Sequence, residues 1–137
     1  MALPRGIRNN NPLNIRKGND WQGERYPQTD KAFEEFKSME YGIRAGFKIL
    51  RNYMTGYHGM VAKRNTVISI IEKWAPPIEN ATNNYATFVA DHMGISRYQK
   101  FTFSDRKKMV DMVDAMIQVE CGQKVDRAII ESAYDMV

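Results

Sequence analysis

Cysteine and histidine are almost absent from this sequence of 137 residues, which contains one Cys and two His. A single cysteine, Cys121, cannot form an internal disulfide or a thiolate metal site, and we interpret it as a packing residue in an apolar helix. His58 and His92 lie too far apart in the sequence to suggest a shared metal site. We therefore expect no metal and no cofactor.

Long hydrophobic runs are also absent. The stretch from Val67 to Ile71 is far shorter than the roughly 20 apolar residues that cross a membrane. The N-terminus lacks the apolar region of a secretory signal peptide. We expect a chain without a membrane span that is made in the cytoplasm and acts at a cell wall or in a virion if other proteins deliver it.

Several familiar motifs are missing as well: a glycine-rich phosphate loop, His-Glu-x-x-His and a serine nucleophile elbow. A content of 43% hydrophobic and 26% charged residues is typical of one globular domain, which we expect to span residues 1–137. The net charge is +4, and basic residues cluster in 5–17 and 97–108. Such clusters fit either an anionic partner or a solvated surface. Because no recognition motif accompanies them, we do not expect a nucleic-acid partner.

Apolar spacing and capping residues predict five helices and a mainly α fold of the α+β class. The helices extend from the N-cap Ser38 to about Gly56, over Val67–Trp74, from Thr82 to Gly94, from Ser104 to Gly122, and from about Lys124 onward. Pro76 and Pro77 are expected to end the second helix. Near the N-terminus, Trp21–Tyr26 and Lys31–Phe36 flank a turn and predict a small β ribbon, and residues 1–20 are expected to be irregular.

Glu79 has the most unusual setting of the glutamates. It follows Trp74 and the Pro76-Pro77 pair, and Asn80 comes directly after it. A carboxyl held rigidly beside an indole can act as a general acid on a glycosidic oxygen, because burial raises the pKa of a carboxyl toward neutrality. The alternative is that Glu79 only complements the dipole at the start of a helix.

Other glutamates offer the same chemistry. Glu40 is the second catalytic candidate, although an acid in the first turn of a helix is also explained by the helix dipole. Glu34 and Glu35 lie in the predicted ribbon, where lysozyme-like enzymes can carry a second carboxylate and where most acids are simply solvated. We therefore expect Glu79 or Glu40 to carry any catalysis.

The segment from Arg5 to Arg16 holds four asparagines and three arginines around one proline, with no acid. Amide and guanidinium groups offer many hydrogen-bond donors to a ligand, whereas Asn and Pro also favour turns that cap a neighbouring element. We expect the run to bind a ligand together with aromatic residues that adjoin turns. The candidate binding residues are Arg8, Asn9, Asn10, Asn11, Asn14, Arg16, Trp21, Trp74, Asn80 and Tyr85.

Several motifs occur together between residues 5 and 95. They are the Arg5–Arg16 run, Trp21-Gln22-Gly23, Phe33 with Phe36, Gly42-Ile43-Arg44-Ala45, and Trp74-Ala75-Pro76-Pro77 followed by Glu79-Asn80, Thr82 and Tyr85. In combination they resemble a family of phage-type virion structural proteins that occurs in phages and in bacterial genomes. The stretch from Asn11 to Arg16, followed by Trp21, is also similar to a region of flagellar-type glucosaminidases.

This resemblance implies a lysozyme-like domain that binds or cleaves the glycan strand of bacterial peptidoglycan, with phage or secretion-apparatus proteins as further partners. Related enzymes usually carry their acid on a helix ahead of such a motif, where this sequence has Met1 to Pro4. The acid would then come from Glu79 or Glu40. We predict a lysozyme or lytic transglycosylase, which in the lytic case needs one carboxylate because the substrate supplies the nucleophile. The alternative is a non-catalytic virion or wall-binding module.

Overall fold

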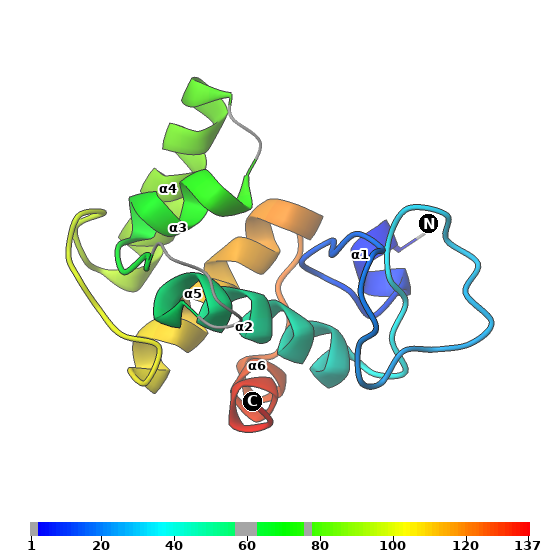
Figure 1. The fold of residues 1–137 in the computed structure, drawn as a ribbon. Helices are drawn as coiled ribbons and strands as arrows, with labels where there is room; N and C mark the ends of the chain where they lie inside the picture. The colour runs from blue at the N-terminus through cyan, green and yellow to red at the C-terminus, as the bar shows by residue number, and fades with distance from the viewer. Residues whose placement is uncertain (1–2, 57–62, 76–77) are drawn as a thin grey trace. The chain divides into compact units, whose positions relative to one another are not determined.

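The computed structural model describes residues 3–56, 63–75 and 78–137, and it is mainly helical over these residues (Figure 1). The helices within the described ranges are α1 (Arg5–Arg8), α2 (Met39–Thr55), α3 (Val67–Trp74), α4 (Glu79–Met93), α5 (Arg106–Cys121) and α6 (Arg127–Asp135). The prediction of a mainly α fold is confirmed, and a lysozyme-like fold stays a prediction. None of the helices in these ranges has the length and apolar character needed to cross a membrane.

The chain divides into two compact units. The terminal unit comprises Met1–Lys48 together with Met116–Val137, and the central unit comprises Ile49–Ala115. Helices α2 and α5 each contribute residues to both units. One domain over residues 1–137 stays a prediction.

Most helix bounds agree with the capping signals of the sequence. Helix α3 has the predicted bounds, because a capping box fixes its start. The Thr66 hydroxyl accepts a hydrogen bond from the Ser69 backbone N–H, and the Ser69 hydroxyl accepts one from the Thr66 backbone N–H. Helix α4 ends as expected at Gly94, whose φ of 71° is left-handed. Pro76 and Pro77, expected to stop α3, lie outside the described residues.

Helix starts differ from the prediction in four places. Helix α5 begins at Arg106, two residues after the expected Ser104. Helix α4 begins at Glu79 rather than after Thr82, because the extended Ile78 caps it and an acid in its first turn meets the positive end of the helix dipole. Helix α6 begins later than expected, where the Asp126 carboxylate accepts a hydrogen bond from the Ala128 N–H. The short helix α1 forms in a segment that was expected to be irregular.

The predicted β ribbon is wrong in detail. The described part of the terminal unit contains isolated antiparallel bridges between Arg16 and Phe33 and between Glu24 and Phe36, with no extended ladder. The reason lies in the turn, where side chains bond to backbone groups that a ladder would use. The Gln28 amide donates to the Arg25 carbonyl at 2.6 Å and its oxygen accepts from the Glu35 N–H at 3.2 Å, while the Glu35 carbonyl accepts from the Arg25 N–H.

In the terminal unit, the segment around Asn10 and Leu13 lies directly on helix α2. Two glycines one turn apart permit this approach: a Cβ on Gly42 would lie 1.8 Å from the Asn10 carbonyl oxygen, and one on Gly46 would lie 2.2 Å from Leu13 Cδ1. Leu13 is consequently buried. Further along α2, the Phe47 ring packs edge-on against Tyr134 of α6, with centroids 5.4 Å apart.

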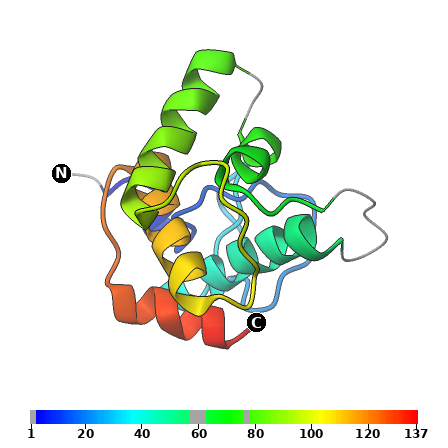
Figure 2. The same cartoon turned by 90° about the vertical axis from the view of Figure 1, so that its left-hand side faces the viewer.

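In the central unit, α3 and α4 lie side by side in both ribbon views (Figures 1 and 2). Their buried residues include Ile70 and Ile71 of α3 and Val89 of α4. The segment that follows α4 is tied back to the start of α3, because the Ile68 N–H donates to the Arg97 carbonyl and the Phe101 N–H donates to the Asn65 carbonyl. Residues that follow α4 are thereby held beside α3.

Candidate functional site

The Asn11 side chain is buried and bonds entirely within the chain. Its amide donates to the Ile15 carbonyl at 2.9 Å and to the Glu34 carbonyl at 3.0 Å, and its oxygen accepts from the Ile15 N–H at 2.9 Å. One side chain therefore fixes its own turn and joins it to a segment more than twenty residues away.

The other asparagines of the run also donate within the chain. Asn10 donates to the Phe36 carbonyl at 3.0 Å, and Asn14 donates to the Glu120 carbonyl at 3.0 Å. Both have a φ of 54°, a left-handed conformation that Asn tolerates better than most residues. Asn9 donates to the Asp30 carboxylate at 2.9 Å. These amides thus shape the terminal unit, and their contact with a ligand stays a prediction.

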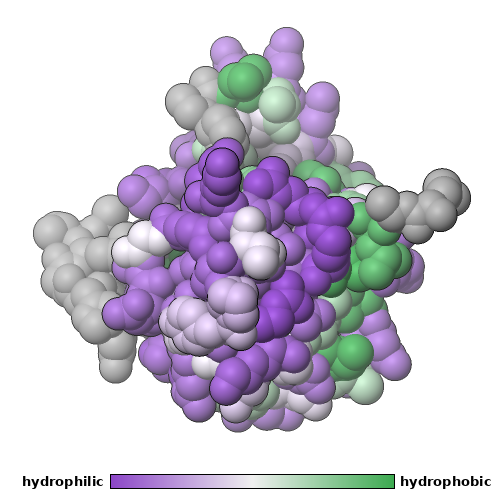
Figure 3. Space-filling model, turned by 90° about the vertical axis from the view of Figure 1, so that its right-hand side faces the viewer, coloured by the Kyte–Doolittle hydropathy of each residue, from purple (hydrophilic) through white to green (hydrophobic). Residues whose placement is uncertain are grey.

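A pocket of about 580 Å³ opens in the terminal unit, and we call it the cationic pocket. Its lining is Arg5, Arg8, Asn9, Arg25, Thr29, Asp30, Lys31 and Glu35. Every one of these side chains is polar or charged. The face of the molecule turned to the viewer in Figure 3 is likewise largely hydrophilic.

Asp30 anchors one side of the cationic pocket. The Arg5 guanidinium donates to both Asp30 carboxylate oxygens at 2.5 and 2.6 Å, which holds the pKa of Asp30 well below its usual range. The same guanidinium lies 4.5 Å from the centre of the Phe33 ring, and the Arg16 guanidinium lies 4.8 Å from that centre. Two predicted binding arginines of the run, Arg8 and Arg16, are thus placed differently: Arg8 lines the pocket and Arg16 packs on Phe33.

Glu35 anchors the other side. Burial alone would raise the pKa of Glu35, but hydrogen bonds from the Asp30 N–H, from Thr29 and from the Arg25 guanidinium lower it to about 2. The donors lie 2.5 to 3.1 Å from the carboxylate. Glu35 is 2% exposed, so the expectation that it is solvated was wrong.

A second pair of buried carboxyls lies in the same unit. Glu24 is 8% exposed and Glu34 is 3% exposed. Burial, followed by the charge of Glu24, raises the pKa of Glu34 to about 7. The backbone N–H of Trp21 donates to the Glu24 carboxylate at 2.8 Å. Among the described residues, neither Glu34 Oε2 nor the indole nitrogen of Trp21, a predicted ligand-binding residue, has a hydrogen-bond partner.

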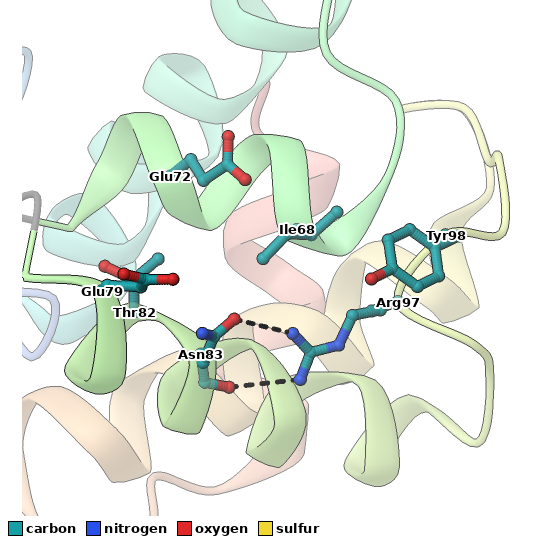
Figure 4. Close-up of a pocket in the computed structure, with 7 residues that line it drawn as sticks. All are labelled: Ile68, Glu72, Glu79, Thr82, Asn83, Arg97 and Tyr98. Carbon is teal, nitrogen blue, oxygen red and sulfur yellow. Dashed lines mark hydrogen bonds between the residues drawn. The ribbon is translucent and has the colours of Figure 1, made fainter.

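In the central unit, Glu79 lines a groove of about 590 Å³ between α3 and α4 (Figure 4). The lining residues are Ile68, Glu72, Glu79, Thr82, Asn83, Arg97 and Tyr98. Figure 4 shows the two carboxylates toward one end and Arg97 with Tyr98 at the other. The Arg97 guanidinium is fixed on α4 by hydrogen bonds to Asn83 Oδ1 at 3.1 Å, to the Asn83 carbonyl at 3.3 Å and to the Thr87 hydroxyl.

The remaining predicted residues have diverse environments. Glu40 is half-buried in the first turn of α2 in the terminal unit, whereas Glu79 is exposed and belongs to the central unit. Asn80 is exposed beside Glu79, Tyr85 is buried on α4, and Trp74 is half-buried at the end of α3. Catalysis by Glu79 or Glu40 stays a prediction.

Sequence reasoning missed several residues that line these sites. Tyr98 is 72% exposed in the groove, and only its place beside Arg97 in a basic cluster distinguished it in the sequence. Asp30 was missed as a pocket anchor because it pairs with Arg5, which is 25 residues away, and Glu35 was missed because it pairs with Arg25 across the turn. A signal for the burial of Glu34 and Glu35 was available, since both lie directly between Phe33 and Phe36.

The chain is similar to a protein of a known phage. It is 45% identical over 122 residues to Protein P5 of Pseudoalteromonas phage PM2, and the match covers 86% of this chain and 71% of that protein. This chain belongs to the family of Protein P5. No protein-family model matches the sequence.

Membership in the Protein P5 family confirms the phage part of the resemblance. The lysozyme-like domain and the cleavage of peptidoglycan stay predictions.

The buried Glu24–Glu34 pair predicts a pH dependence of stability. Because the pKa of Glu34 is raised from 4.5 to about 7 in the folded protein, the folded state holds this proton more tightly than the unfolded state. The contribution of this proton to the free energy of unfolding is complete below about pH 4.5, and it is lost as the pH rises through about 7. Each pKa unit corresponds to about 1.4 kcal/mol, so the loss amounts to roughly 3 to 4 kcal/mol. Lys17 and Asp20 also face Glu34, with opposite effects on its pKa.

Glu34→Gln keeps the shape of the neutral carboxyl and removes the titration. Its free energy of unfolding, measured by urea denaturation, is expected to vary less than that of the parent protein between about pH 5 and about pH 8. Glu72→Gln, at an exposed carboxyl of the central unit, is the matched control and should keep the parent profile. A Glu34→Gln protein with the same pH profile as the parent would contradict a buried proton on this pair.

Proposed function

We propose that this chain is a virion component of a phage, or of an element derived from a phage, and that it binds the glycan strand of peptidoglycan. The observation that carries the virion assignment is the 45% identity to Protein P5 of phage PM2 over most of the chain. In this role, phage proteins or a secretion apparatus bring the chain to the cell wall.

The α3–α4 groove is the binding site that suits a glycan strand. Sugars present apolar ring faces and many hydroxyls, which aromatic rings and fixed polar groups recognise together. Tyr98 offers an exposed aromatic ring at one end, while the Glu72 and Glu79 carboxylates accept hydrogen bonds at the other. Arg97 contributes donors from a position that Asn83 and Thr87 hold in place. The groove thus combines a stacking surface with acceptors and donors.

The virion assignment is tested on particles made by the genome that encodes the chain. We expect the protein to co-sediment with density-gradient-purified virions and to be detected by mass spectrometry at a constant ratio to the major capsid protein. Particles stripped with high salt serve as a control for proteins that only adhere. Recovery of the chain solely from the soluble fraction of the lysate would contradict the assignment.

A second candidate function is cleavage of the strand, and the presence of two carboxylates in one groove favours it. Glu79 would act as the general acid and give a proton to the leaving glycosidic oxygen as that bond breaks. A hydroxyl of the same sugar would form the new bond to the anomeric carbon, and its proton would return to the Glu79 carboxylate. The product is an anhydro sugar, and no water is consumed.

One experiment addresses binding and cleavage with separate measurements. Purified peptidoglycan is incubated with each variant, the bound protein is measured by pelleting, and released muropeptides are measured by mass spectrometry. Loss of the Tyr98 ring in Tyr98→Ala should weaken binding roughly tenfold, since burial of an aromatic ring contributes about 1.5 kcal/mol or more. Tyr26→Ala is the matched control, because Tyr26 is also exposed but lies in the terminal unit.

Cleavage predicts anhydro-muropeptides with the parent protein and at least about 100-fold less with Glu79→Gln. Glu40→Gln, in the other unit, should retain the parent rate. Release that depends on Glu40 and not on Glu79 would overturn the assignment of the acid. Binding without release by the parent protein would exclude cleavage and leave glycan binding, and equal binding by Tyr98→Ala and the parent would contradict the groove as the binding site.

A further inference from the structure

The cationic pocket of the terminal unit offers a ligand donors and almost no acceptors. The Asp30 carboxylate already accepts hydrogen bonds from Arg5, from Asn9 and from the N–H groups of Ala32 and Phe33. The Glu35 carboxylate is equally occupied by Arg25, Thr29 and the Asp30 N–H. Both acids therefore serve to position arginines, and they have little capacity left to accept from a ligand.

The pocket also carries a surplus of positive charge. Arg5, Arg8, Arg25 and Lys31 contribute four charges, and Asp30 and Glu35 remove two, which leaves +2. Both carboxylates stay ionised near neutral pH, because their hydrogen bonds lower the pKa of each. Arg8 and Lys31 are both exposed. Their side chains make no hydrogen bond or ion pair with the other described residues.

We propose that the cationic pocket is a binding site for a phosphate group. Guanidinium groups are strong hydrogen-bond donors to phosphate oxygens, and the buried Asp30 and Glu35 side chains hold Arg5 and Arg25 in place through part of each guanidinium before any ligand arrives. A phosphate monoester carries a charge of about −1.5 to −2, which matches the surplus of the pocket, whereas a single carboxylate does not. Among the described residues, the lining includes no aromatic or aliphatic side chain on which a sugar or a base could stack.

A free phosphate ester and the backbone of a nucleic acid share this chemistry. The site does not depend on the proposed glycan binding, because its residues belong to the terminal unit and those of the α3–α4 groove belong to the central unit. Failure of either proposal leaves the other intact.

The test uses the full chain and a double variant, Arg8→Ala with Lys31→Ala. This variant removes two charges from the pocket while leaving the Arg5–Asp30 and Arg25–Glu35 pairs in place. The control is Lys100→Ala with Lys124→Ala, which removes two charges from exposed positions outside the pocket. Thermal unfolding of both variants verifies that each is folded.

The first probe is inorganic pyrophosphate. Its binding is measured by isothermal titration calorimetry and by NMR of the arginine side chains. We expect the pocket variant to bind at least tenfold more weakly than the parent protein and the control variant to bind like the parent. The Arg5 and Arg25 guanidinium signals should shift on titration of the parent. Sodium acetate at equal ionic strength is expected to leave these signals unchanged.

The second probe is a short DNA duplex, whose affinity is measured at several salt concentrations. If the ligand is a nucleic-acid backbone, the slope of log affinity against log salt falls by about two in the pocket variant alone. If the ligand is a free phosphate ester, only pyrophosphate binding depends on the pocket. Equal weakening in both variants, or no effect of the pocket variant on either probe, would overturn the proposal.

Discussion

The buried side chain of Asn11 is the interaction on which the terminal unit most depends. Residues 9–37 form no extended ladder in the described structure, so their buried backbone groups need partners from elsewhere. The Asn11 amide supplies two of these partners, at Ile15 and at Glu34. The Glu34 N–H donates back to the Ile15 carbonyl, and the Phe36 N–H donates to the Asn9 carbonyl. Two loop segments are thus joined much as two strands would be.

This arrangement also explains the place of the charged residues. Asn9 reaches Asp30, and Asp30 orients Arg5, so the run that closes the loops also builds one side of the cationic pocket. Burying carboxylates is unfavourable unless donors surround them, and here most of the donors are backbone N–H groups and arginines from the same unit. The Arg and Asn run is therefore a scaffold that holds a donor-rich surface in place.

The sequence predicted the helical part of the fold much better than the rest. Thr66 and Gly94 mark helix ends through local hydrogen bonds and a left-handed φ, so neighbouring residues suffice to find them. The partners of the asparagines are distant in sequence, as with Asn14 and Glu120, which are 106 residues apart. The same limit applies to the groove: Glu79 was found by its local motif, but Tyr98 joins it only because the segment after α4 is tied back to α3.

Asn11→Asp tests the central claim most directly, because it keeps the size of the side chain and replaces the donating amide with an oxygen. The free energy of unfolding should fall by roughly 3 kcal/mol, since the Glu34 carbonyl loses the Asn11 amide, the Ile15 carbonyl keeps only the Glu34 N–H, and a charge is buried beside them. Asn80→Asp, at an exposed position, should change stability by less than about 0.5 kcal/mol. If urea denaturation gave the same small change for both variants, the Asn11 side chain would not be what holds the terminal unit together.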